Sequence, residues 1–244
     1  MRKTGKILLL AALISASVNY AQYTDQINTN RPGESMSAFA VGKTVFQIET
    51  GIYGMHEKHN VLNYEANGLG LDATIRYGFL FEELELIGDI QYQMDQYKNL
   101  VESYGRNDFR QFTIGAKYLL YDPDKNYTPE VNLYSWKANH KFKWRSMIPA
   151  LAVYAGVNIM GKDNPYTFPT DKLSPKLIAI AHNHFGKWVW VNNIIADKIM
   201  TDYPSFGLIS TVTRGFNERW SGFTEVQIYR SEEHTSELQS HLNL

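Results

Sequence analysis

Alternation of apolar and polar residues with a period of two runs through most of this 244-residue chain. In residues 84–95, Leu84 and Leu86 fall on one side. Glu85 and Asp89 fall on the other side. Successive side chains of a β-strand point to opposite faces, whereas a helix would scatter the same residues around its circumference. The alternation therefore predicts strands that have one apolar and one polar face.

Nine segments carry this pattern, and each has about the 9–11 residues that a tilted membrane strand needs, or slightly more. The predicted strands are 44–55, 69–80, 84–95, 109–120, 147–160, 173–185, 188–199, 205–214 and 220–229. In 173–185 apolar residues stand on both faces, so the alternation is less clean there. A chain of many such strands predicts an antiparallel sheet that must bury its apolar face.

The connections between these strands differ in length in an ordered way. Long polar connections are expected at 55–68, 95–108 and 161–172, and short ones at 81–83, 186–187 and 215–219. Outer-membrane barrels have long loops outside the cell and short turns in the periplasm. Residues 121–146 break the order, because a long aromatic and basic stretch stands where a short turn is expected.

The polar face carries charged side chains from several strands: Glu49, Asp72, Arg76, Glu85, Asp89, Lys117 and Glu225. An apolar face can be buried inward, as in soluble barrels, or turned to lipid, and the alternation by itself is compatible with both. A water-filled interior accommodates charges, and aromatic residues such as Tyr77, Phe79 and Trp188 stand near strand ends. We therefore predict an all-β fold, an antiparallel transmembrane β-barrel whose lumen these seven charged residues line.

The two ends of the chain differ from this body. Residues 1–21 have the charged-then-apolar order of a secretory signal peptide, whereas the alternative is a buried N-terminal helix. Residues 230–244 resemble the conceptual translation of a sequencing adapter, so we expect a non-native tail and a barrel truncated before its last strands. The alternative there is a solvated polar tail. Between the ends lie an N-terminal segment at 22–43 and the barrel at 44–229.

Composition gives little support to catalytic, metal or nucleic-acid functions. The chain has no cysteine, which excludes thiolate ligands and cysteine nucleophiles, and its net charge of −1 argues against a nucleic-acid partner. Two pairs of histidines are weak metal candidates: His56 with His59 stands in a polar stretch typical of a solvated loop, and His182 with His184 lacks a visible third ligand. No motif joins a nucleophile to a histidine as a hydrolase needs. We expect no enzyme activity, no cofactor and no metal.

Four short motifs resemble one family of membrane proteins. They are Thr29–Ser35 (TNRPGES), Val45–Gly51 (VFQIETG), Ser135–Phe142 (SWKANHKF) and Ile194–Asp197 (IIAD). They are similar to the outer-membrane transporters grouped under the phenol-degradation meta-pathway name, in the form typical of Bacteroidetes. The resemblance covers residues 22–229 and implies an outer-membrane location and a barrel that ends in further strands. The family name comes from a pathway context and implies no particular substrate.

The polar segment before the first strand has two interpretations. It is either a periplasmic leader or an insert that narrows the lumen through Asn30, Arg31 and Glu34. As an insert, it would pair Arg31 with an interior carboxylate: Glu49, Asp72 or Asp89.

The expected function is passive or facilitated passage of a small solute across the outer membrane, with that solute and membrane lipid as partners. Five carboxylates against two bases on the polar face predict a preference for neutral or cationic solutes over anions. Inner-face tyrosines such as Tyr53 and Tyr154 favour small aromatic solutes. The alternatives are a non-transporting structural or surface-binding barrel and a secreted soluble β protein.

Overall fold

The computed structural model describes most of the chain between residues 29 and 243. The described residues are 29–31, 33–59, 63–127, 134, 144–160, 164–166, 172–201, 204–217, 220–231 and 240–243. The predicted signal peptide at 1–21 lies outside them, as do residues 22–28 and most of 128–143.

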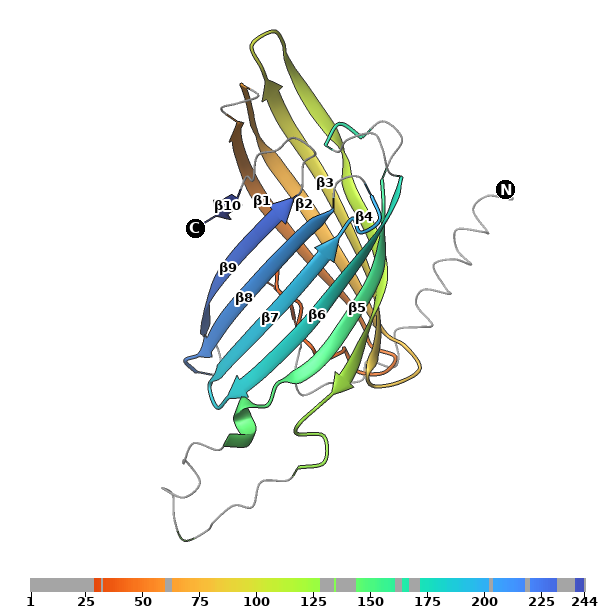
Figure 1. Ribbon diagram of the computed structural model, residues 1–244, viewed down its shortest axis with the longest axis vertical. Helices are drawn as coiled ribbons and strands as arrows, with labels where there is room; N and C mark the ends of the chain where they lie inside the picture. Colours follow the sequence, from red (N-terminus) through yellow and green to blue (C-terminus); the bar gives the residue numbers. More distant parts are fainter. Residues whose placement is uncertain are drawn as a thin grey trace, which may run out of the picture.

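The described residues form one antiparallel sheet of ten strands whose spatial order follows the chain (Figure 1). The strands are β1 (Phe46–His59), β2 (Tyr64–Gly78), β3 (Leu84–Lys98), β4 (Ser103–Tyr121), β5 (Ala150–Ile159), β6 (Leu173–Phe185), β7 (Trp188–Asp197), β8 (Ser205–Gly215), β9 (Ser221–Ser231) and β10 (Ser240–Asn243). All nine predicted strands are present. The predicted fold class, an all-β antiparallel sheet consistent with part of a β-barrel, is confirmed.

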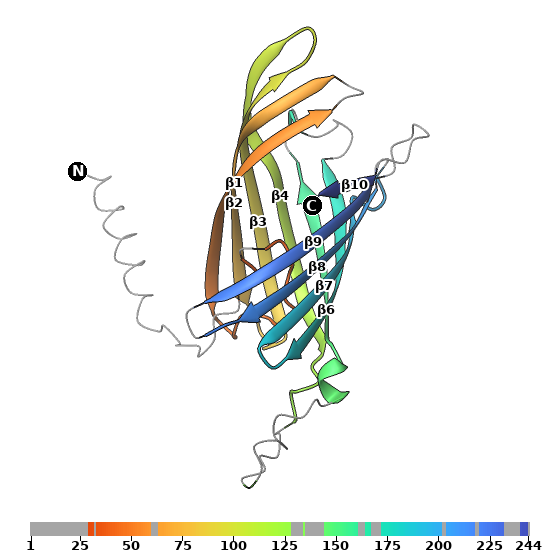
Figure 2. The ribbon, with the colours of Figure 1, turned by 90° about the vertical axis from the view of Figure 1, so that its left-hand side faces the viewer.

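The sheet curls into a half-barrel that has a concave and a convex face (Figure 2). Among the described strands no ladder joins β1 to β9 or β10, so the sheet is open along that side. The short β10 falls inside the stretch predicted to be a non-native tail, and it pairs with residues 227–230 of β9.

The prediction of long loops at 55–68 and 95–108 is wrong, because most of these residues belong to the strands. The β1–β2 ladder continues to His59 and Tyr64, and the β3–β4 ladder continues to Lys98 and Ser103. Polar side chains on both faces are compatible with a strand where water contacts both faces of the sheet. Cross-strand ring contacts support the extensions: the Tyr97 ring lies 5.3 Å from the Tyr64 ring and 5.4 Å from the Tyr104 ring. The hydrogen-bonded strands therefore continue beyond the residues in which apolar and polar side chains alternate.

The irregular stretch 121–146 is described only in part. Residues 122–127 form a turn in which the Asp122 carboxylate accepts the backbone N–H of Asp124 at 2.9 Å. A single turn of 3-10 helix, η2 (Trp144–Met147), leads into β5.

The two faces of the sheet differ in polarity. On the convex face Ile52 is 80% exposed and Ile194 63% exposed. On the concave face the charged side chains of Arg76, Glu85 and Lys117 are fully buried. A soluble protein buries apolar side chains and leaves charges in water, which is the opposite arrangement. No helix among the described residues has the length and apolarity to cross a membrane.

Candidate functional site: the interior of the curved sheet

The described residues between 29 and 43, here called the inner segment, lie inside the curve of the sheet (Figure 2). The segment ends at a parallel bridge between Lys43 and Gly78, and the backbone N–H of Thr44 donates to the carbonyl of Gly78 at 2.9 Å. This bridge places the preceding residues on the concave side, where they contact strands at both ends of the sheet.

The beginning of the inner segment binds carboxylates of β1 and β2. The backbone N–H of Asn30 donates to Glu49 at 3.2 Å, and the Arg31 guanidinium forms an ion pair with Asp72. Of the three carboxylates proposed as partners of Arg31, the structure therefore selects Asp72. Gly51 makes room for the pair, because a Cβ at that position would lie 2.7 Å from the Asp72 Oδ1.

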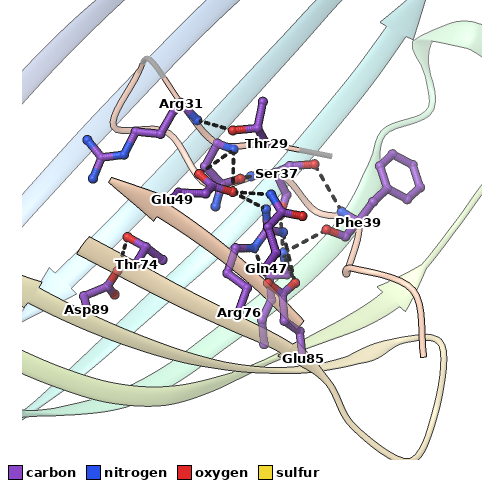
Figure 3. A network of polar contacts seen from close by, with 12 residues as sticks. Thr29, Arg31, Ser37, Phe39, Gln47, Glu49, Thr74, Arg76, Glu85 and Asp89 are labelled. Carbon is purple, nitrogen blue, oxygen red and sulfur yellow. Dashed lines mark hydrogen bonds and ion pairs between the residues drawn. The ribbon is translucent and has the colours of Figure 1, made fainter. Parts of the chain in front are cut away.

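A continuous row of buried charges crosses the first four strands, and Figure 3 labels its members Glu49, Arg76 and Glu85. The Arg76 Nη1 donates to the Glu49 Oε1 at 3.0 Å, and its Nε and Nη2 donate to the Glu85 carboxylate. The Lys117 Nζ lies 2.8 Å from the Glu85 Oε2. Two cations thus neutralise two carboxylates. Because an unpaired charge is costly at a buried site, each member holds the next in place.

Lys117 also connects this charged row to the inner segment. Its Nζ donates to the backbone carbonyls of Ser37 and Phe39, both at 2.9 Å. The ammonium group therefore has a carboxylate and two carbonyl acceptors, which uses all three of its donors.

The far wall holds the same segment with amide and carboxylate groups. The Asn193 side chain on β7 forms two bonds with Met36: its Oδ1 accepts the backbone N–H at 2.5 Å, and its Nδ2 donates to the carbonyl at 2.9 Å. On β9, Glu225 accepts the backbone N–H of Glu34 at 3.1 Å and that of Ser35 at 3.3 Å. The inner segment is thus tied to both halves of the sheet.

Apolar side chains fill the space between the segment and strands β5–β8. The buried cluster comprises Ala38, Ile87, Ala150, Ala152, Tyr154, Ile178, Ile180, Val191, Ile195 and Ile209, with Met36 and Phe39 packed against it. The Phe39 ring meets the His182 ring edge-on with centroids 4.9 Å apart, and the Ser37 hydroxyl lies 3.2 Å from the His182 Nδ1. The interior beside β1–β4 is therefore lined mainly by charged groups, and the part next to this cluster mainly by apolar ones.

The structure places all seven predicted lining residues on the concave side. Besides the row described above, Asp89 accepts the Thr74 hydroxyl at 2.7 Å, and Glu225 accepts the Thr211 hydroxyl at 2.6 Å. Of the residues proposed to narrow the lumen, Glu34 lies 3.8 Å from Arg31.

Several interior polar residues were not among the predicted lining residues, including Lys176, Asn193 and Asp197. Lys176 and Asp197 face each other in the β6–β7 ladder. They lie where apolar residues occupy both faces, so alternation did not assign a side. Asn193 carries no charge, so a search for charged residues passes over it. The sequence did contain a signal for Asn193: it is a polar residue that stands between two apolar residues on the same face of its strand.

A partly enclosed cavity of about 140 Å³ remains between the inner segment and the sheet. Its lining combines Arg31, Glu34 and Met36 with Asp72, Asp89, Lys176, Ile178, Ile195, Ile209 and Tyr229. The cavity therefore has a charged wall and an apolar wall, and the inner segment closes one side of it. This arrangement suits a small molecule that has both polar and apolar parts. Within the described residues, no three His, Asp or Glu side chains gather in a way that could hold a metal ion.

Comparison with protein-family models gives a match. The family model described as "Putative MetA-pathway of phenol degradation" matches residues 29–239, from the start of the inner segment through all the long strands. None of the curated proteins matches the chain.

Proposed function

This chain belongs to the MetA-pathway family of phenol degradation, and we propose that it is an outer-membrane barrel that admits a small solute through an interior narrowed by its own N-terminal segment. The observation that carries the proposal is the polarity of the sheet. The convex face exposes large apolar side chains, whereas the concave face buries ion pairs. Lipid would cover the first and water or solute would contact the second.

Aromatic residues support a membrane location at the end of the sheet with short turns, which join β2 to β3, β6 to β7 and β8 to β9. The exposed side chains there include Phe79, Phe81, Tyr118, Tyr121, Trp188, Phe216 and Trp220. Outer-membrane barrels carry such aromatic girdles at the level of the lipid headgroups. The alternative of a secreted soluble β protein would leave a convex apolar face in water, and such large patches lead to association.

The inner segment supports a restricted rather than an open passage. It spans from Glu49 on β1 to Glu225 on β9, and the cavity borders it. In this proposal the segment, where it borders the cavity, limits the size of the solute that passes. No catalytic step, cofactor or metal is part of the proposal.

The balance of interior charges supports a preference for neutral or cationic solutes. Arg76 and Lys117 are neutralised in the buried row, and Arg31 is neutralised by Asp72. Asp89, Glu34 and Lys176 remain on the cavity lining, which leaves a mildly acidic surface. Acidic linings favour cations over anions. Tyr229 adds an aromatic surface at the same cavity.

The filled interior favours a second candidate function. The buried charged row and the apolar cluster close much of the concave side at the end with short turns. A non-transporting barrel with a structural or surface-binding role would need no more than this.

Solute flux through liposomes separates the two candidates. Liposomes containing the protein should pass small neutral or cationic solutes faster than anions of equal size. Arg31→Ala should increase the flux, because it removes the ion pair that holds the inner segment to β2. Lys125→Ala, which changes an exposed turn, is the matched control and should leave the flux unchanged. A flux no higher than that of empty liposomes, for the parent and for Arg31→Ala, would favour the structural candidate.

A further inference from the structure

Arg214 on the convex face has different surroundings from the cations of the interior. Arg214, near the end of β8, is exposed on the face that otherwise presents Phe206, Leu208 and Val212. It forms no ion pair with any carboxylate that the structure describes, whereas Arg31, Arg76 and Lys117 each have one. A guanidinium keeps its charge at every physiological pH and has five N–H donors. Arg214 therefore presents donors toward the surroundings of the barrel.

Aromatic rings hold the Arg214 guanidinium in place. Its Cζ lies 4.9 Å from the Trp188 ring centroid and 5.5 Å from the Phe216 ring centroid. Trp188 is the cross-strand partner of Arg214 in the β7–β8 ladder. The Phe216 ring packs over Gly222 of β9, where a Cβ would come within 3.1 Å of it. Cation–π contacts of this kind fix a guanidinium without using its hydrogen-bond donors.

The position of Arg214 corresponds to the headgroup level of a bilayer. It stands beside exposed aromatic residues at the end with short turns, and Trp220 there is 71% exposed. Further along the same face lie Trp190, Val212 and Ile194, which are exposed and largely apolar. Aromatic girdles mark the boundary between the hydrocarbon and the headgroups. The anionic group available to a cation at that depth is the phosphate of a phospholipid.

We propose that the convex face of β7 and β8 binds the phosphate of an anionic phospholipid through Arg214, with the acyl chains lying along the apolar side chains of the same strands. The proposal rests on the outer-membrane location proposed above. Charge complementarity carries it, since guanidinium and phosphate form paired, charge-assisted hydrogen bonds. Lys187 in the adjoining turn is exposed, and its carbonyl accepts the backbone N–H of Gly215 at 2.9 Å. A second positive charge near the site favours a lipid with net negative charge over a zwitterionic one.

Lipid retention measured by native mass spectrometry tests the site. The parent protein in detergent micelles, supplied with phosphatidylglycerol, should retain at least one lipid, and with phosphatidylcholine it should retain less. Arg214→Gln should weaken phosphatidylglycerol retention about tenfold, as expected for loss of a charged hydrogen-bonded pair. Phosphatidylglycerol retention by Arg214→Lys should lie between that of the parent and that of Arg214→Gln, because lysine keeps the charge and loses the paired geometry. Lys98→Gln, an exposed cation at the opposite end of the sheet, is the control.

Three outcomes would overturn the proposal. Equal phosphatidylglycerol retention by Arg214→Gln and the parent would show that Arg214 holds no lipid. Displacement of the lipid by an equal concentration of inorganic phosphate would identify a site for free phosphate instead. Failure of the parent to float with phosphatidylglycerol vesicles in a density gradient would refute the membrane location, and with it the lipid site. Flotation of all variants together with equal retention would refute the lipid site alone, so the two failures are distinguishable.

Discussion

The two halves of the concave wall hold one segment by different chemistry. Strands β1–β4 contact it through carboxylates and cations, of which the Arg31–Asp72 pair and the Lys117 bonds to two carbonyls are the main contacts. Strands β5–β8 contact it mainly through apolar packing, with Asn193 bonded to the backbone of Met36. Ion pairs require exact partners, whereas apolar packing requires only matching shape. The charged half therefore sets the position of the segment, and the apolar half excludes water behind it.

The charged half should show the largest effect of a single substitution. Arg76→Met leaves Glu49 and Glu85 without their shared cation, and we expect a loss of about 3–5 kcal/mol in the free energy of unfolding. Urea titration of the protein in lipid vesicles measures it. Arg76→Lys keeps the positive charge and should lose less. If Arg76→Met unfolds at the same urea concentration as the parent, the buried row does not stabilise the fold.

A charge introduced on the convex face should lower the free energy of unfolding somewhat less than Arg76→Met does. Ile194 is 63% exposed near the middle of β7, so Ile194→Arg places a guanidinium against lipid and should cost about 2–4 kcal/mol. The matched change on the concave face is Asp89→Asn. It should cost about 1 kcal/mol or less, since the new amide oxygen still accepts the Thr74 hydroxyl. Equal effects of the two substitutions on folding into vesicles would contradict the assignment of the faces.

The apolar half should respond weakly to loss of a single methyl group. Ile180 is 2% exposed beside the inner segment, and Ile180→Val should cost about 0.5–1.5 kcal/mol. Ile228→Val on the convex face is the control, because its side chain is 46% exposed and leaves no cavity. A larger loss for Ile180→Val than for Arg76→Met would reverse the comparison between the two halves.

An exposed ion pair outside both halves should have the smallest effect. Lys125 donates to Glu83 in the turn before β3, and this hydrogen bond holds the pKa of the Glu83 carboxyl below its usual value. Because the pKa is lower in the folded state, any stabilisation is present above the unfolded pKa and is lost as the pH falls through the folded one. Glu83→Gln should leave the urea midpoint at neutral pH unchanged. In an NMR titration, Lys125→Gln should return the Glu83 pKa toward its ordinary value, and an unchanged pKa would exclude Lys125 as the cause.

Residue order alone was sufficient for the strands and for the two faces of the sheet. Alternation located nine strands, because a period of two is a local property that each strand displays without its neighbours. It also placed Glu49, Arg76 and Glu85 on one side. The limits of the strands were less well predicted, since the β1–β2 and β3–β4 ladders continue where both faces are polar. Hydrogen bonding between strands, rather than side-chain pattern, determines where a ladder ends.

Only the tertiary structure decided which interior groups meet. Three carboxylates were equivalent partners for Arg31 in the sequence, and the curl of the sheet brings Asp72 to it with room provided by Gly51. The contact between Asn193 and Met36 joins residues 157 positions apart, so no local pattern carries it. The apolar residues on both faces of β6 obscured the alternation because their concave members pack against the inner segment. A strand pattern records which face is buried, but the identity of the group that covers it depends on where the rest of the chain folds.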